Sequence, residues 1–512
     1  MQQVPLGPKN TADENAYSHE NNIDGPAVIL KKQLDEHHQP VEHHALPPPS
    51  QQTEAKHVTP THSSPFINKQ YTNLISSRTS TVLFATDEWF ARAENLLSDT
   101  DPEFISDLYC EQGKVMDGWE TRRRRVEGHD WCIVALGNDG GNDLYGVELD
   151  TAFFTGNQTP RVSIQVANCR AGSDCDDDCD EGEEWKYTWM PGAVSRMARG
   201  GGIQGTGMKP QQVKRAEAAA GNFNWTEVLP MTELRPGYEE TRMHYFHVND
   251  EIREEVKGFT HVRVNYYPDG GVARLRLWGH EVKEESDIAC TRMSNKVVID
   301  ELDALPSAKP YPEPELSCEI NGGQGLACSN KHYGVPSNLI RQGYGKDMGD
   351  GWETARHPDR PPILIKDPET GLIDSPLMDW AILKLGMGGC NENGVSRIIL
   401  DTKHFKGNFP ESVKIEACDA SSLPLNLDNE TGEEKKTCDD GTCGEEILEL
   451  KWFPLLNRSR MGPDREHVFD RNSKALVNSK RKMTHIRVSI FPDGGLSRVR
   501  IYGQPMESSL PF

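Results

Sequence analysis

Two copies of one polar motif are the residues of this chain best suited to chemistry. An Asp-Gly-Trp-Glu-Thr segment lies at residues 117–121 and again at 350–354, and an arginine follows each copy at the same spacing, Arg123 and Arg356. A carboxylate can exchange protons with a reacting group, and a planar guanidinium can hold an anion through two hydrogen bonds. The repeated polar residues therefore indicate a shared structural corner, a shared site, or both.

The motif belongs to a repeat of domain size. An Asp-Trp pair, a Leu-Asp-Thr segment, a Gly-Asn pair and a Pro-Asp-Gly-Gly turn follow it in the same order in both copies. These segments begin at residues 130, 149, 156 and 268 in the first copy and at 379, 400, 407 and 492 in the second. Repeats of this length predict two globular domains and not a short solenoid unit.

Short alternating segments predict strands around the motif. Residues 161–166 and 412–417 alternate between apolar and polar side chains, as do the segments on both sides of each Pro-Asp-Gly-Gly turn. Long amphipathic helices do not separate these segments, so the pattern favours antiparallel sandwiches over a parallel doubly wound sheet. The predicted fold is all-β. His261, Arg263 and Arg274 fall on the polar face of the last hairpin, which is either a solvated outer face or part of a site.

Composition gives the expected domain boundaries. Residues 1–78 are rich in Gln, His, Pro, Asn and Ser and poor in aromatic residues, which predicts a disordered tail. The remaining boundaries are repeat 1 at 79–280, a linker at 281–316, repeat 2 at 317–504 and a C-terminal tail at 505–512.

Several segments interrupt the repeats. Acidic inserts at 173–184 and 426–446 carry cysteine pairs, but their spacing fits neither a zinc site nor a calcium loop, so solvated mobile loops are favoured. A Gly-rich stretch at 200–207 lacks the Lys-Ser/Thr ending of a phosphate loop. We expect it to be part of a flexible insertion that continues through the Ala-rich residues 215–220.

Charge and hydropathy exclude several classes of protein. The 512 residues carry 56 Lys and Arg against 79 Asp and Glu, a net charge of -23, which disfavours nucleic acid and anionic membranes as partners. No apolar run reaches the roughly 20 residues of a membrane span, and the first residues do not resemble a secretory signal. The 12 cysteines are therefore expected to be reduced thiols of a cytoplasmic protein. A homo-oligomer is expected.

The two copies of the motif, the Gly-Asn pairs and the paired Pro-Asp-Gly-Gly turns closely resemble the allantoicase family. The resemblance covers about residues 80–504 and leaves out the tail and the acidic inserts. It implies two tandem jelly-roll β-sandwich domains. It also implies a hydrolase of linear amidine C–N bonds that converts allantoate to ureidoglycolate and urea, a step of purine-nitrogen salvage. Only the resemblance, and not the composition, points to this substrate.

The residue types suit this chemistry. Allantoate carries a carboxylate and two ureido groups on one carbon. Carboxylates can accept the ureido N–H groups and activate water, and departing urea needs a proton. The candidates for acid–base catalysis are Glu120, Asp150, Glu353 and Asp401. The candidates for binding the substrate carboxylate are Arg123, Arg263, Arg274 and Arg356. His129 and His244 are weaker candidates, and both Trp residues of the motif are expected to pack in the core.

Other functions remain as alternatives. A non-enzymatic protein that binds carbohydrate or another small ligand can use the same sandwich fold, and a structural protein can use duplicated halves for assembly. The sequence leaves open whether a divalent metal serves as cofactor and which repeat holds the site. The residues around the motif differ between the copies, so the halves need not be equally active: Arg122, Arg124 and Arg125 stand against Ala355, His357 and Pro358.

Overall fold

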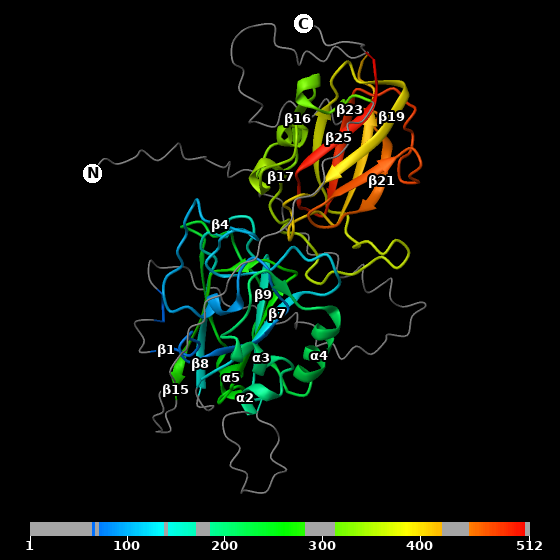
Figure 1. Ribbon diagram of the computed structural model, residues 1–512. Helices are drawn as coiled ribbons and strands as arrows, with labels where there is room; N and C mark the ends of the chain where they lie inside the picture. The colour runs from blue at the N-terminus through cyan, green and yellow to red at the C-terminus, as the bar shows by residue number, and fades with distance from the viewer. Residues whose placement is uncertain are drawn as a thin grey trace, which may run out of the picture. The chain divides into compact units, whose positions relative to one another are not determined.

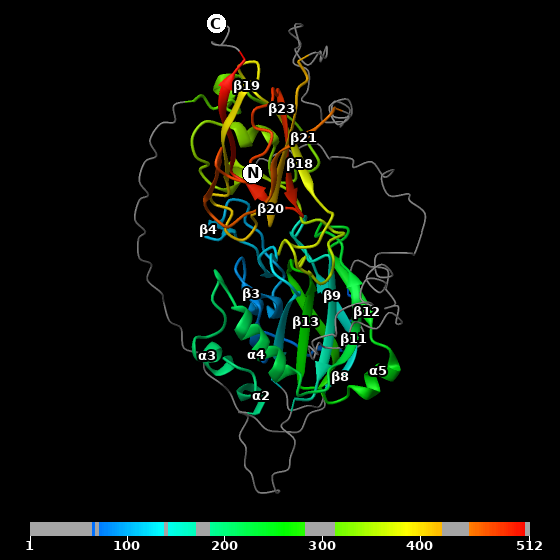
Figure 2. The ribbon, with the colours of Figure 1, turned by 90° about the vertical axis from the view of Figure 1, so that its right-hand side faces the viewer.

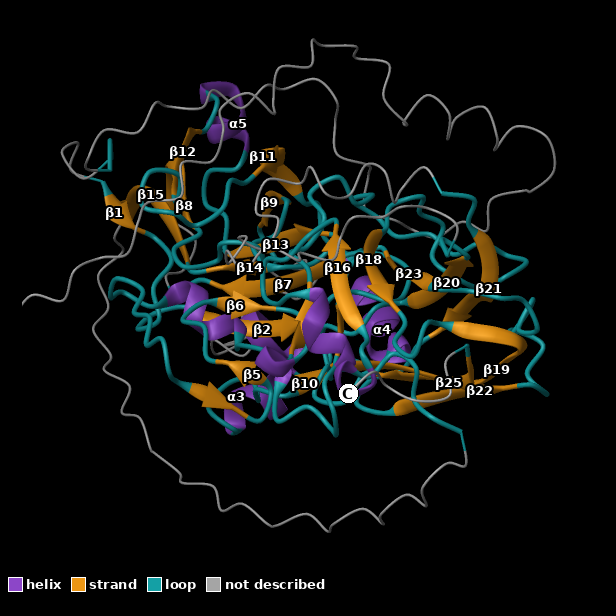
Figure 3. Ribbon diagram, turned by 90° about the horizontal axis from the view of Figure 1, so that it is seen from above, coloured by secondary structure: helices purple, strands orange, loops and turns teal. Residues whose placement is uncertain are grey.

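The computed structural model describes residues 64–66, 71–137, 142–169, 185–281, 313–421 and 450–506. The chain divides into two units, Met1–Pro48 and Pro49–Phe512, and all described residues lie in the second. Strands dominate the described secondary structure (Figure 3). Both predicted acidic inserts lie outside the described residues, as do residues 1–63 of the predicted tail and residues 282–312 of the predicted linker.

Repeat 1 is a sandwich of two antiparallel sheets (Figure 1). The five-stranded sheet has the order β11 (Thr226–Glu233), β9 (Arg161–Ala167), β13 (His261–Tyr267), β7 (Asp130–Ala135) and β2 (Thr81–Ala85). The four-stranded sheet has the order β1 (Thr72–Asn73), β15 (Arg274–Glu281), β8 (Asn142–Asp150) and β12 (Met243–His247).

Repeat 2 has the same strand order, without a counterpart of β1 among the described strands. Its five-stranded sheet runs β21 (Phe453–Arg460), β20 (Ser412–Cys418), β23 (His485–Phe491), β18 (Asp379–Lys384) and β16 (Gln324–Cys328). Its second sheet runs β25 (Arg498–Pro505), β19 (Cys390–Asp401) and β22 (Glu466–Asp470). The prediction of an all-β chain with two tandem jelly-roll sandwiches is confirmed.

The inner sheet faces form one hydrophobic core in each repeat. In β13 the side chains of Val262, Val264 and Tyr266 point into the core of repeat 1, as the alternating pattern predicts. Trp119 and Trp352 are fully buried in the two cores and anchor the repeated motif there. Their indole N–H groups donate to the backbone oxygens of Asp87 and Asn330, at 2.8 and 2.9 Å.

The outer face of the five-stranded sheet in repeat 1 is covered and not solvated. Helices α2 (Trp185–Thr188), α3 (Ala193–Ala198) and α4 (Pro210–Ala220) lie beside this sheet (Figure 2). Ala193, Ala216 and Ala220 pack against β7 in a separate apolar cluster. The prediction that residues 200–220 are a flexible insertion is therefore wrong, because the small Ala side chains let α4 approach the sheet closely.

Each motif pairs with the Pro-Asp-Gly-Gly turn of its own repeat. Strand β6 (Trp119–Glu120) pairs with β14 (Gly271–Val272), and β17 (Trp352–Glu353) pairs with β24 (Gly495–Leu496). The turn needs glycine at Gly270 and Gly494, since both have a φ of +145°. The motif glutamates are therefore held on short two-stranded ladders at the edge of each core.

The remaining elements are short. They are β3 (Asp87–Glu88), β4 (Tyr109–Cys110), β5 (Gly113–Lys114), β10 (Thr206–Gly207), α5 (Asp250–Glu255) and the 3-10 turns η2 (Ala93–Leu97), η3 (Glu319–Asn321), η4 (Pro336–Ile340) and η5 (Met348–Asp350). None of the helices in the described part of the chain is long and apolar enough to cross a membrane.

Repeat 1 begins earlier than the predicted boundary at residue 78. Thr72 and Asn73 form strand β1 against β15, and Leu74 and Ile75 are buried in the core of repeat 1. Phe66 is also buried and lies against Gly146. Composition missed this segment because a few apolar side chains that complete a sheet edge do not change the average of a polar stretch. Repeat 2 likewise starts before residue 317, since the backbone of Leu316 donates to Ile501 and its side chain is buried.

Candidate active site

The two motif glutamates occupy equivalent, nearly buried positions. Glu120 is 5% exposed and Glu353 is 8% exposed. Each accepts a hydrogen bond from the asparagine of the repeated Gly-Asn pair, Asn157 Nδ2 to Glu120 at 2.9 Å and Asn408 Nδ2 to Glu353 at 2.8 Å. The repeat therefore builds the same carboxylate–amide pair twice.

The motif arginines cross from one repeat to the other. Arg123 of repeat 1 donates to Glu353 of repeat 2 at 2.9 Å and to the backbone oxygen of Thr354 at 2.6 Å. In the reciprocal contact, Arg356 donates to Glu120 at 3.4 Å and to the backbone oxygen of Thr121 at 2.8 Å. The chain thus joins its repeats through two related sets of contacts, each with residues from both repeats.

The aspartates of the two Pro-Asp-Gly-Gly turns complete this arrangement. Asp493 accepts from Arg123 at 2.8 Å, and Asp269 accepts from Arg356. Arg360 donates to both oxygens of Asp269 at 2.7 and 3.0 Å and lies 3.5 Å from Asp493. We call the six residues that share these reciprocal contacts the inter-repeat centre: Glu120, Arg123, Asp269, Glu353, Arg356 and Asp493.

The pKa values of the carboxyl groups in the inter-repeat centre are shifted in opposite directions. Burial raises the pKa of Glu120, and the nearby Glu353 carboxylate adds to this rise, although Arg356 and Asn157 oppose it. Burial also acts to raise the pKa of Asp269 and Asp493, but their arginine partners overcome it and lower both values. The turn aspartates are therefore fixed anions, whereas Glu120 is the carboxyl group that burial biases toward its protonated form.

The two halves of the inter-repeat centre carry different neighbours. Next to Glu353, a Cβ added at Gly407 would lie 2.9 Å from Cδ1 of Trp89 in repeat 1. Next to Glu120, a Cβ added at Gly156 would lie 2.5 Å from Nε2 of His332 in repeat 2. Both glycines are required by this close approach. The same position thus holds an indole in one half and an imidazole in the other.

Tyr333 adds a second difference. It follows His332, its backbone N–H donates to the backbone oxygen of Glu353 at 3.1 Å, and its side chain is 37% exposed. Burial and the carboxylates of Glu353 and Glu120 raise the pKa of its phenol. Burial and Arg123 lower the pKa of His332. Repeat 2 therefore supplies a neutral imidazole next to Gly156 and a protonated phenol near Glu353 and Glu120.

The other two acid–base candidates lie at the ends of β8 and β19, in different surroundings. Asp150 forms a two-pronged ion pair with Arg242, at 3.0 and 2.6 Å. The equivalent Arg465 turns away and donates to His467 at 3.3 Å. Asp401 accepts from the backbone of Lys403 through one oxygen, and its Oδ2 has no hydrogen-bond partner among the described residues. Burial raises the pKa of Asp401.

The other two arginine candidates lie apart from the inter-repeat centre. Arg263 is buried on the outer face of β13, where its guanidinium lies 4.2 Å from the Trp131 ring and donates to Asn265. Burial lowers its pKa to about 10. Arg274 donates to the Asp117 carboxylate at 2.6 Å and to the backbone oxygen of Thr100 at 2.8 Å. Of the eight predicted site residues, the structure therefore brings together Glu120, Arg123, Glu353 and Arg356.

The weaker histidine candidates have local partners. His129 shares a hydrogen bond of 3.1 Å with Asn265, and burial, with help from Arg263, lowers its pKa to about 3. His244 accepts from the backbone N–H of Arg235 at 3.0 Å. Both remain away from the inter-repeat centre.

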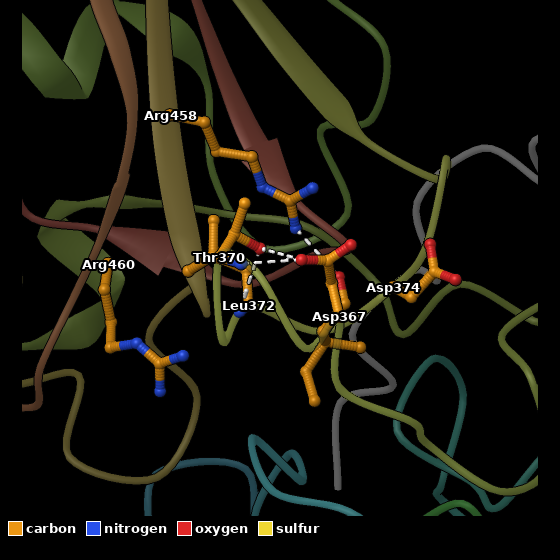
Figure 4. Close-up of a pocket in the computed structure, with 7 residues that line it drawn as sticks. Asp367, Thr370, Leu372, Asp374, Arg458 and Arg460 are labelled. Atoms are coloured by element: carbon orange, nitrogen blue, oxygen red, sulfur yellow. Dashed lines mark hydrogen bonds between the residues drawn. The ribbon is translucent and has the colours of Figure 1, made fainter. Parts of the chain in front are cut away.

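Two surface cavities lie outside the inter-repeat centre. One of about 290 Å³ in repeat 1 is lined by Phe104, Phe153, Tyr238 and Arg242 among others, and so adjoins the Asp150 ion pair. The other, of about 470 Å³, lies in repeat 2 (Figure 4). There the side chains of Arg458, Arg460, Asp367 and Asp374 surround the space. None of the eight predicted site residues lines either cavity.

Metal ligands were also sought in the described ranges. These residues contain no group of three or more His, Cys, Asp or Glu side chains that could hold a metal ion. The seven cysteines within these ranges are all free thiols.

The family model described as the allantoicase repeat matches this chain twice, at residues 72–282 and 314–506. The chain belongs to the allantoicase family. A probable allantoicase of Pseudomonas paraeruginosa is 33% identical over 438 residues, which is 85% of this chain and 97% of that protein. A probable allantoicase of Pseudomonas syringae pv. syringae is 32% identical over 445 residues, covering 86% and 98% of the two chains.

A solved structure of allantoicase from Saccharomyces cerevisiae is 28% identical to this chain and covers 86% of it and 95% of its own length, with a TM-score of 0.27. The two matches of the family model agree with the two sandwiches, and the first begins at Thr72, where β1 begins.

Sequence reasoning missed several residues of the allantoicase repeat that meet at the inter-repeat centre. Asp269, Asp493, Asn157 and Asn408 belong to the repeated segments, but the Pro-Asp-Gly-Gly pattern by itself predicts only a tight reversal. Their exact retention in both copies was the signal. Arg360 has no counterpart in repeat 1, and nothing in the sequence pointed to it.

Proposed function

We propose that this protein is a hydrolase that converts allantoate and water to ureidoglycolate and urea, in the degradation of allantoin. The observation that supports this function is the match of the allantoicase family to both repeats over most of the chain. The alternative of a non-enzymatic ligand-binding protein leaves the buried glutamates and the nearby His332 imidazole between the repeats without a role.

The reaction places definite demands on a site. One C–N bond of allantoate breaks, its carbon gains a hydroxyl from water, and the departing nitrogen gains a proton. A carboxyl group with a raised pKa can give that proton, and a neutral base can take the remaining proton from water. Glu120 and His332 have these properties.

We place the reaction at the inter-repeat centre. Three buried arginines, Arg123, Arg356 and Arg360, and the half-buried Arg125 face Glu120, Glu353, Asp269 and Asp493. When Glu120 is protonated, this set carries one excess positive charge, which favours an anionic substrate. Asp150 and Asp401 remain second candidates for acid–base chemistry, and Arg263 and Arg274 remain second candidates for the substrate carboxylate.

Incubation of the purified chain with allantoate and measurement of urea tests this function. Urea and ureidoglycolate are expected in equal amounts. No turnover by a folded sample, with and without added divalent metals, would refute it.

The free thiols and the acidic charge support a cytoplasmic location, and a homo-oligomer remains a proposal that light scattering after size-exclusion chromatography tests.

A further inference from the structure

Two polar atoms of residues next to Gly407, in the half of the centre that holds Glu353, have no hydrogen-bond partner among the described residues. They are Oδ1 of Asn408 and Nε1 of Trp89, and both atoms are buried. Asn408 is 5% exposed, and its Nδ2 donates to Glu353 at 2.8 Å and to the sulfur of Met348 at 3.3 Å. Because a carboxylate only accepts, the amide nitrogen must face Glu353 and the amide oxygen must point away from it.

The residues that carry the two atoms meet around Gly407. Gly407 directly precedes Asn408, and a Cβ added at Gly407 would lie 2.8 Å from Arg122 Cγ and 2.9 Å from both Phe90 Cζ and Trp89 Cδ1, the ring carbon bonded to Nε1. Repeat 1 supplies the indole and repeat 2 supplies the amide and the carboxylate. A buried donor or acceptor without a partner is costly, so such atoms in a folded protein need an explanation.

An acceptor, a donor and a carboxylate around one position suit a ligand group that offers both N–H donors and a carbonyl acceptor. A ureido group offers several N–H donors and one carbonyl acceptor. Its N–H groups suit Asn408 Oδ1 and Glu353, and its carbonyl oxygen suits the N–H of Trp89. No charge on the ligand is needed for these contacts, which fits a neutral ureido group better than an anion.

The other half of the centre has the same plan with one change. Asn157 donates to Glu120 as Asn408 does to Glu353, and His332 stands over Gly156 where Trp89 stands over Gly407. The change replaces an indole, which only donates, with an imidazole, which can take up a proton. One half is therefore equipped to hold a ureido group and the other to exchange protons with one.

We propose that one substrate molecule bridges both halves, with its retained ureido group on Asn408 and Trp89 and its departing ureido group at Glu120 and His332. This inference rests on the proposed function. Allantoate carries two chemically identical ureido groups on one carbon, so a site with two similar halves can bind both. The difference between the halves then decides which group leaves and which face of the carbon receives the hydroxyl.

The step balances without another reactant. The C–N bond to the departing group breaks, and the Glu120 carboxyl gives its proton to that nitrogen, which leaves as urea. Water adds its hydroxyl to the carbon and gives its other proton to the His332 imidazole. Return of that proton to Glu120 restores the site.

The test separates binding from turnover with hydantoate, which has one ureido group, a carboxylate and no second ureido group to lose. Trp89→Phe and Asn408→Ala remove the two unpartnered atoms. His332→Gln and Asn157→Ala are the matched controls, because they change the equivalent positions of the other half. Calorimetry measures hydantoate binding, urea release from allantoate measures turnover, and thermal melting checks folding.

The expected results differ by half. Trp89→Phe and Asn408→Ala each weaken hydantoate binding about tenfold or more, the loss that corresponds to one buried hydrogen bond. His332→Gln and Asn157→Ala bind hydantoate within about twofold of the unchanged chain, while His332→Gln lowers turnover about a hundredfold, as expected for loss of an acid–base group. Trp89 is half-buried and phenylalanine keeps most of its packing, so this variant remains informative if Asn408→Ala does not fold.

Two outcomes overturn the inference while the proposed function stands. One is turnover by the unchanged chain with normal hydantoate binding by both Trp89→Phe and Asn408→Ala. The other is turnover by the unchanged chain without any binding of hydantoate. Absence of turnover by the folded, unchanged chain refutes the proposed function, and this inference with it.

Discussion

Repeat 1 and repeat 2 share one architecture but carry different residues next to their motif glutamates. Both place a glutamate on a two-stranded ladder, hold it with an asparagine, and reach it with an arginine from the other repeat. The neighbours of these groups differ, with Trp89 and Phe90 in repeat 1 against His332 and Tyr333 in repeat 2. The shared contacts fix how the repeats join, whereas the unshared residues are free to specialise.

The largest expected effect comes from breaking the glutamate pair. Glu120→Gln should lower kcat about 10²- to 10⁴-fold, because it removes the proton for departing urea. Glu353→Gln should mainly raise KM, because Glu353 lies with Asn408 and Trp89. The measurement is steady-state urea release by both variants, with melting curves to confirm folding. Equal losses of kcat would show that the halves act alike.

The pH dependence of kcat/KM tests the different roles proposed for Glu120 and His332. In the proposed mechanism the protonated form of Glu120 is the acid, so kcat/KM should fall as the pH rises through its raised pKa. The neutral form of His332 is the base, so kcat/KM should also fall as the pH drops through its lowered pKa. His332→Gln should remove the acidic limb only. A profile in which both limbs persist would contradict this assignment.

The second effect concerns the joint between the repeats. Asp269→Asn and Asp493→Asn should each destabilise the protein by about 3–5 kcal/mol, because each leaves buried arginines without their anion. Chemical denaturation measures this loss. Both aspartates have lowered pKa values, so the difference from the unchanged chain is complete above pH 3.8, the pKa of a free aspartate, and shrinks as the pH falls below it. A loss under about 1 kcal/mol would show that the ion pairs of the inter-repeat centre add little to stability.

The sequence predicted several residues of the inter-repeat centre but not the contacts between them. The duplicated motif predicted two sandwiches, the buried Trp119 and Trp352, and a special role for Glu120 and Glu353. It did not reveal that Arg123 and Arg356 exchange partners, because a repeat shows which residues recur and not which copy they touch. Nor did it point to His332, which lies where the copies differ. Contacts between distant segments depend on packing that periodicity does not encode.

A third effect tests the edge of repeat 1. Deletion of residues 1–78 should lower the free energy of unfolding by about 2–5 kcal/mol, the range for loss of a large buried apolar side chain. It removes β1 with Leu74 and Ile75, which pack in the core of repeat 1. Deletion of residues 1–63 is the control and should cost much less, since that segment has a composition that does not form a core. Thermal melting compares the two, and equal stability would place β1 outside the cooperative fold.

The smallest effect compares the ends of β8 and β19. Asp150→Asn should cost about 1.5–3 kcal/mol, because it breaks the two-pronged contact with the half-buried Arg242 and removes its charge. Asp401→Asn should cost under about 1 kcal/mol, since its Oδ2 has no hydrogen-bond partner among the described residues and burial already biases the carboxyl toward its neutral form. Denaturation of both variants at neutral pH measures the difference. Measurement of turnover gives the clearer result. Loss of kcat in Asp401→Asn without loss of stability would show that Asp401, and not Glu120, is the general acid.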